Sequence, residues 1–196
     1  NKAAVKYDSL GIEADNYMQT STPGIYAAGD VVKGRHNLTH MAANDAATAV
    51  IRGSLKRPLG FLASKKSSQN QVPNAVFSEP TLAHIGPLVL PKGATKHCLS
   101  FNNIDRALTE DQTVGQLTIA LNARRQVIAA SVVGFRADEL ITSLSLAVHH
   151  KMKMENLAKF VVPYPTMSMA IKKLAAEYSL QRQSRSWYAK LLWKRS

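Results

Sequence analysis

The chain has 196 residues, of which 45% are hydrophobic, and a formal net charge of +12 at pH 7. This composition can bury a core of one or two domains, and no apolar run reaches the roughly 20 residues that a transmembrane helix needs. Before residue 179 the Lys and Arg residues lie singly or in pairs without aromatic residues between them, so no nucleic-acid partner is expected.

The first residues and the cysteine content indicate a longer parent chain and a cellular location. The first residue is Asn1, and residues 1–15 contain neither an apolar signal core nor a cleavage site, so we expect these residues to continue a longer chain. Cys98 is the only cysteine, which excludes an internal disulfide, a C-x-x-C pair and a cysteine-based zinc site within this sequence. We expect a reducing, cytoplasmic location and no metal.

Residues 12–53 have the pattern of alternating short strands and a helix. Residues 25–28 form an apolar run of strand length, and a helix is expected after Asn37, because apolar and small residues recur there at helical spacing. Gly53 is a candidate helix stop. The polar segment 64–71 has the composition of a linker, and the predicted domain boundary lies in the linker range 61–71.

Residues 72–178 are predicted to contain an antiparallel hairpin and two helices. From Gly115 the residues Leu117, Ile119 and Leu121 alternate with Thr118, Ala120 and Asn122. A turn follows at residues 122–126, and an apolar run leads to Gly134. A helix is expected from Asp138. Its predicted buried face consists of Leu140, Ile141, Leu144, Ala147 and Val148. The last helix is expected to open after Pro165 and to run toward Tyr178.

Two further segments have open interpretations. Residues 95–101 are predicted to form a strand, in which Cys98 is interpreted as a small buried hydrophobe rather than a redox centre. The tail, residues 179–196, has no acidic residue and alternates cations with Trp, Tyr and Leu. It is interpreted as a helix packed on its own domain or, alternatively, as a peripheral membrane contact.

The most specific pattern is residues 20–30, Thr-Ser-Thr-Pro-Gly-Ile-Tyr-Ala-Ala-Gly-Asp. An apolar segment ends in Gly29, whose missing side chain allows a close approach to the backbone, and in the carboxylate of Asp30. This stretch resembles the second flavin-contacting motif of the pyridine nucleotide-disulfide oxidoreductases, the family of dihydrolipoamide dehydrogenase, glutathione reductase and mercuric reductase. The resemblance implies that Asp30 bonds a ribityl hydroxyl of FAD.

The helix after Asn37 is the second part of this resemblance. A helix start offers backbone N–H groups and the positive end of the helix dipole. In the family this turn points at the pyrimidine edge of the flavin, which makes Thr39, His40, Met41 and Ala42 candidate cofactor contacts through the main chain. His40 is also a candidate catalyst, but a packing or surface histidine is the favoured interpretation.

The remaining sequence resembles the dimerisation domain of the same family. The resemblance lies in residues 72–86, in the hairpin and in residues 137–141. It implies an α+β fold, an antiparallel sheet with flanking helices, preceded by the C-terminal piece of an α/β FAD-binding domain. The expected division is residues 1–60 for the FAD-binding segment, 61–71 for the linker, 72–178 for the dimerisation domain and 179–196 for the basic tail.

The closing motif departs from the family pattern. Disulfide reductases of the family have His-Pro-Thr-x-x-Glu, in which the glutamate orients the proton-shuttling histidine. Here Tyr164 occupies the histidine position and Met169 the glutamate position. A phenol with a pKa of about 10 is a poor base at neutral pH, and a thioether cannot orient one. Tyr164 is a candidate catalytic residue, or a side chain that packs beneath the neighbouring subunit.

The resemblance therefore predicts the C-terminal part of a FAD-dependent, homodimeric oxidoreductase that takes electrons from NAD(P)H. It predicts that this part contributes to the flavin site, mediates homodimerisation and is inactive by itself. The tyrosine resembles that of mercuric reductases, but no cysteine follows Cys98, whereas those enzymes carry a C-terminal cysteine pair. An alternative is a non-catalytic assembly module in a parent protein that has lost disulfide chemistry.

Overall fold

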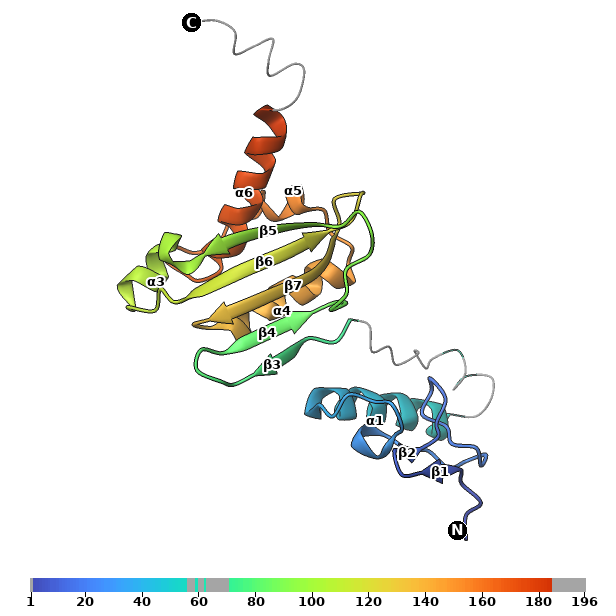
Figure 1. Cartoon of the computed structure of the whole chain (residues 1–196). Helices are drawn as coiled ribbons and strands as arrows, with labels where there is room; N and C mark the ends of the chain where they lie inside the picture. Colours follow the sequence, from blue (N-terminus) through green and yellow to red (C-terminus); the bar gives the residue numbers. More distant parts are fainter. Residues whose placement is uncertain (1, 56–58, 60–61, 63–70, 185–196) are drawn as a thin grey trace, which may run out of the picture. The chain divides into compact units, whose positions relative to one another are not determined.

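A computed structural model describes residues 2–55, 59, 62 and 71–184. The chain divides between Val72 and Pro73 into two compact units, unit 1 (residues 1–72) and unit 2 (residues 73–196). The elements of each unit are labelled in Figure 1. The expected linker lies almost wholly outside the described residues, and so do residues 185–196 of the basic tail.

The described part of unit 1 contains two very short strands, a 3₁₀ turn and one long helix. The strands are β1 (Tyr7–Asp8) and β2 (Gly11–Ile12), which pair with each other in antiparallel fashion. The turn η1 (Gly29–Val31) leads to helix α1 (Thr39–Ser54). The inner face of α1 is formed by Met41, Asp45 and Thr48, at the spacing that places side chains on one side of a helix. The helix predicted after Asn37 is confirmed.

Two details of unit 1 differ from the sequence-based expectation. Residues 25–28 do not form a regular strand, because they pair at a single bridge, between Gln19 and Tyr26. Gly53 does not stop the helix, which continues to Ser54. A Cβ atom at Gly53 would lie 3.0 Å from Cε2 of Tyr26, so this glycine makes room for the tyrosine ring.

Unit 2 is built on a five-stranded, wholly antiparallel sheet in the order β3-β4-β7-β6-β5. Its strands are β3 (Asn74–Val76), β4 (Leu82–Ile85), β5 (Thr95–Ser100), β6 (Gly115–Leu121) and β7 (Val127–Gly134). The predicted hairpin is therefore the β6–β7 pair at the centre of the sheet. The expected α+β class is confirmed.

Helices cover one face of this sheet. They are α4 (Ala137–His149), α5 (Met154–Leu157) and α6 (Met169–Ser184); α4 lies behind β7 and β4 in Figure 1. The turn η2 (Phe101–Asn103) and the short helix α3 (Asp105–Thr109) connect β5 to β6. The five residues predicted to form the inner face of the helix from Asp138 are all buried in α4. The last helix begins at Met169 and continues past Tyr178.

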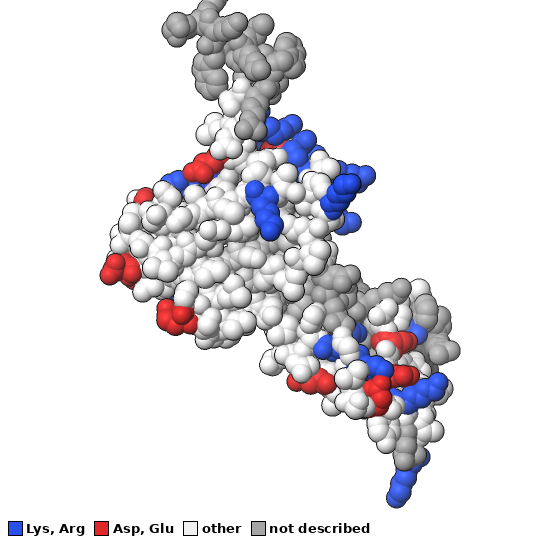
Figure 2. Space-filling model, in the orientation of Figure 1, with Lys and Arg blue, Asp and Glu red and all other residues white. Residues whose placement is uncertain are grey.

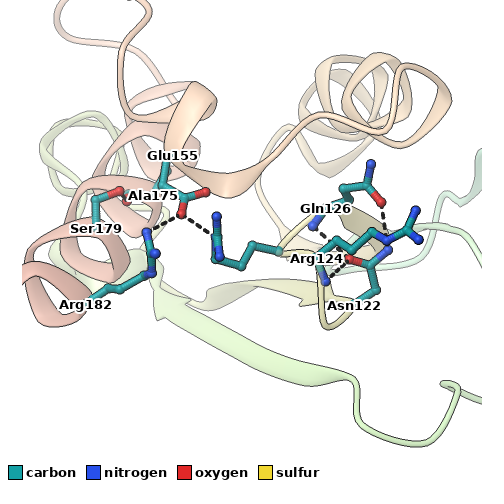
Figure 3. Close-up of polar contacts among 8 residues, drawn as sticks. Asn122, Arg124, Gln126, Glu155, Ala175, Ser179 and Arg182 are labelled. Atoms are coloured by element: carbon teal, nitrogen blue, oxygen red, sulfur yellow. Dashed lines mark hydrogen bonds and ion pairs between the residues drawn. The ribbon is translucent and has the colours of Figure 1, made fainter. Parts of the chain in front are cut away.

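Polar contacts close the hairpin and hold the end of α6 (Figure 3). In the β6–β7 turn, Oδ1 of Asn122 accepts hydrogen bonds from the backbone N–H groups of Arg124, at 2.9 Å, and Gln126, at 3.0 Å. Beside the turn, Oε1 of Glu155 lies 2.8 Å from Nε of Arg125 and accepts a hydrogen bond from Nη1 of Arg182 at 2.9 Å. Glu155 thus links the hairpin turn to the last helix.

The other face of the sheet carries a row of small and polar side chains. His84, Ser131, Thr118 and Cys98 are cross-strand neighbours from β4 to β5. Few Lys, Arg, Asp or Glu side chains interrupt the face of unit 2 seen in Figure 2. Cys98 is exposed on this side of β5, so the interpretation of it as a buried hydrophobe is wrong. The inward positions of β5 belong to His97, which contacts Tyr178, and to Leu99.

Candidate functional site

Unit 1 holds Asp30 at the end of the extended segment. The backbone of Gly29 has a φ of +74°, which favours glycine, and a Cβ atom there would lie 2.8 Å from Cβ of Ala42. Gly29 therefore allows η1 to pack directly on α1. The structure shows this packing role for Gly29, and its expected role in ligand approach stays a prediction. Asp30 is exposed in the first turn of η1.

The start of α1 lies beside this turn. Its N-cap residue, Leu38, makes no side-chain cap hydrogen bond, and the first turn contains no acidic residue. The positive end of the helix dipole is therefore not compensated by a carboxylate in the first turn of the helix. Thr39 and His40 are exposed, whereas Met41 is buried and Ala42 is half-buried against Gly29. Met41 can therefore reach a ligand only through its backbone.

Unit 2 carries the closing motif on a loop before α6. Tyr164 is 69% exposed, so its ring does not pack into unit 2. Its Oη donates a hydrogen bond to Oδ2 of Asp105 at 2.9 Å. The hydrogen bond to this carboxylate, followed by its negative charge, raises the pKa of Tyr164 above the ordinary value. The phenol is therefore protonated at neutral pH.

A cavity of about 220 Å³ lies beside this pair. It is lined by Asn103, Ile104, Asp105, Arg106, Tyr164, Pro165, Thr166, Met169 and Lys173. Met169, at the expected glutamate position, lines the cavity but offers no carboxylate for the phenol hydrogen. No sequence pattern pointed to Asp105, because it lies 59 positions upstream and no local spacing connects it to Tyr164.

Within the described residues, no group of three or more His, Cys, Asp or Glu side chains could hold a metal ion. Among those residues there is also no helix long and apolar enough to span a bilayer. The candidate site residues of the described part are Asp30 and the start of α1 in unit 1, and Tyr164 and Asp105 in unit 2.

Sequence profiles of known families identify both units. The profile described as "Pyridine nucleotide-disulphide oxidoreductase, dimerisation domain" matches residues 72–175, more than half of the chain. The chain belongs to the pyridine nucleotide-disulfide oxidoreductase family. A second profile, described as "Pyridine nucleotide-disulphide oxidoreductase", matches residues 1–46. Unit 2 is thus the dimerisation domain, and unit 1 is the end of a FAD-binding domain.

Two curated relatives in this family show which share of a full-length member the chain covers. The chain is 31% identical to a mercuric reductase of Staphylococcus aureus, over 90% of this chain and 32% of that protein. It is 30% identical to a dihydrolipoyl dehydrogenase of Chlorobaculum parvum, over 88% of this chain and 37% of that protein. The chain therefore spans about a third of the length of these pyridine nucleotide-disulfide oxidoreductases.

Solved structures show the same fold. The crystal structure of LpdA from Mycobacterium tuberculosis superimposes with a TM-score of 0.77 at 24% identity, over 89% of this chain and 38% of that one. The HOCl-induced flavoprotein disulfide reductase RclA from Escherichia coli gives a TM-score of 0.75 at 20% identity, over 88% of this chain and 40% of that one. At these identities the likeness concerns the fold of the family.

Proposed function

We propose that this chain supplies one wall of a flavin site and the homodimer contact of a FAD-dependent oxidoreductase that takes electrons from NAD(P)H. The chain is the dimerisation-domain part of a flavoprotein disulfide oxidoreductase. The observation that carries the flavin role is the packing of Gly29 on Ala42, which holds the exposed Asp30 beside a helix start without an acidic residue. These residues fit a neutral or anionic ring system with a hydroxylated side chain.

Each residue of this wall has a defined task in the proposal. The carboxylate of Asp30 accepts a hydrogen bond from a ribityl hydroxyl of FAD. Backbone groups of residues 39–42 face the pyrimidine edge of the flavin, where the dipole of α1 stabilises negative charge. His40 contributes its backbone, and its side chain is not assigned a catalytic task. When bound, the flavin supplies the hydride and electron transfer between NAD(P)H and the acceptor.

The purified chain is expected to retain no FAD and to show no NAD(P)H oxidation. Asp30 and the start of α1 form one side of a site, and no G-x-G-x-x-G sequence for the pyrophosphate occurs in these residues. Gel filtration after incubation with FAD, followed by visible absorbance, measures retention. With FAD at millimolar concentration, amide chemical shifts should change at residues 29–30 and 39–42 and change less in Asp30→Ala. A stoichiometrically flavinylated preparation would contradict the first expectation.

The chain is also expected to form a two-fold homodimer in which the segment around Tyr164 faces the partner. This segment exposes Val161 at 88% and Phe160 at 39%, an apolar surface suited to an interface. Sedimentation velocity should detect a dimer at micromolar concentration. Val161→Asp should weaken it at least tenfold, because a charge would be buried in the contact.

Val89 provides a matched control for the dimer experiment. It is also 88% exposed, but it lies in the β4–β5 connection. Val89→Asp should leave the dissociation constant unchanged. A wild-type chain that stays monomeric at high micromolar concentration, or equal weakening by both variants, contradicts this placement of the interface.

A second function is favoured by the closing motif alone. Tyr164 and Met169 replace the histidine and glutamate of the disulfide-reducing relatives, which fits an assembly module in a parent without disulfide chemistry. The discriminating observation is the sequence upstream of Asn1 in the parent gene. A C-x-x-x-x-C pair there supports the reductase, and its absence supports another electron acceptor or the assembly role.

A further inference from the structure

We propose that Asp105 is the positioning residue of Tyr164, so that a Tyr–Asp pair stands where disulfide-reducing relatives use a His–Glu pair. The carboxylate comes from α3 rather than from the closing motif. This inference deepens the proposed function and rests on it, because it concerns the side chain at the family's acid/base position. The hydrogen bond of 2.9 Å from Oη of Tyr164 to Oδ2 of Asp105 is the observation that carries it.

The backbone that carries Asp105 is anchored by the core. Phe101, Ile104 and Ala107 flank it, and all three are buried in unit 2. Asp105 opens α3 between the buried residues Ile104 and Ala107, so the backbone that carries its carboxylate is fixed on both sides. A carboxylate on such a support restricts the position of the phenol that donates to it.

Tyr164 lines the same cavity from the loop before α6. It lies between two prolines, and Oγ1 of Thr166 donates a hydrogen bond to the backbone O of Pro163 at 2.8 Å. Nζ of Lys173 on α6 donates to the backbone O of Asn103 at 2.8 Å, which ties α6 to the turn before Asp105. Lys173 thus gives a second link between the segment that carries Tyr164 and the segment that carries Asp105, in addition to the hydrogen bond of the pair.

The two cationic side chains that line the cavity bind groups other than the Asp105 carboxylate, which accepts the hydrogen bond of the phenol. Arg106 forms an ion pair with Glu110 one helical turn later, and Lys173 binds a backbone oxygen. Tyrosine has a single O–H donor. With that hydrogen committed to Asp105, Oη of Tyr164 offers its lone pairs to a bound ligand and does not act as a base at neutral pH.

The test measures the protonation of Tyr164 directly in the 196-residue chain. Tyrosines are labelled with ¹³C at Cζ, the six signals are followed from pH 7 to the alkaline range, and Tyr164→Phe identifies the signal of Tyr164. In the wild-type chain Tyr164 should titrate above its ordinary range. In Asp105→Asn, which keeps the shape and an acceptor oxygen but removes the charge, its pKa should fall.

Asp111→Asn is the matched control. Asp111 is exposed, follows α3, does not line the cavity and has a φ of +53°, which asparagine tolerates. This variant should leave the Tyr164 titration unchanged. An equal Tyr164 pKa in the wild-type chain and in Asp105→Asn, with folded spectra for both, would overturn the proposal. No flavin or electron acceptor takes part in these measurements, so their outcome is independent of the flavin experiments.

Discussion

Replacement of Phe101 by alanine is expected to lower the free energy of unfolding of unit 2 by about 3–5 kcal/mol. The ring is fully buried, at 0% exposure. It fills the space left by two glycines at the open end of the central hairpin: a Cβ atom at Gly115 would lie 2.5 Å from Cδ2 of Phe101, and one at Gly134 would lie 2.8 Å from its Cε2. Alanine would leave a cavity that the paired strands cannot close.

This effect is measured by urea unfolding followed through resolved amide signals of β6 and β7. Phe77→Ala is the matched control, because Phe77 is 79% exposed in the connection between β3 and β4. It removes the same atoms without creating a cavity, so its effect should stay within about 0.5 kcal/mol. Similar losses in both variants would contradict the assignment of Phe101 to the core.

The second large effect is expected in unit 1, where Asp45→Ala should destabilise the fold by about 3–5 kcal/mol. Nε of Arg35 lies 3.6 Å from Oδ2 of Asp45, and the two side chains are only 5% and 0% exposed. Removal of the aspartate takes this negative charge away from a buried guanidinium. The pair connects the loop before α1 to the inner face of that helix, so α1 should lose its hydrogen-exchange protection.

The ion pair between Lys33 and Asp8 is the control for this experiment. Its two side chains are 38% and 42% exposed, and solvent screens their attraction. Asp8→Ala should leave the exchange protection of α1 nearly unchanged. Amides of β6 and β7 should stay protected in every unit 1 variant. Loss of α1 protection in Asp8→Ala equal to that in Asp45→Ala would refute the special role of the buried pair.

Local sequence patterns were sufficient for the regular elements at the centre of unit 2 and for helix α1 of unit 1. The alternation around Leu117 and Ile119, the turn at residues 122–126 and the apolar run to Gly134 predicted the central hairpin, because strand side chains alternate between faces. The helical spacing of residues 140–148 predicted which face of α4 is buried. The Gly29–Asp30 motif and residues 72–86 were sufficient to recognise the family.

Cys98 lies on the exposed side of the alternating pattern of β5. In β5 its side chain shares a face with Lys96 and Ser100, while His97 and Leu99 point to the helices. The alternation could have shown that Cys98 lies with the polar set. Its exposure was decided by the arrangement of layers, because α4, α5 and α6 cover only one face of the sheet.

The sequence by itself thus determined the family, the central hairpin and the amphipathic helices, since these depend on residues within a few positions of one another. The contacts of Tyr164 with Asp105 and of Arg35 with Asp45 were decided only by the tertiary structure. Tyr164 and Asp105 are 59 positions apart, and their side chains meet because the core fixes α3 and the loop before α6 around one cavity. Long-range packing of this kind leaves no periodic signal in the sequence.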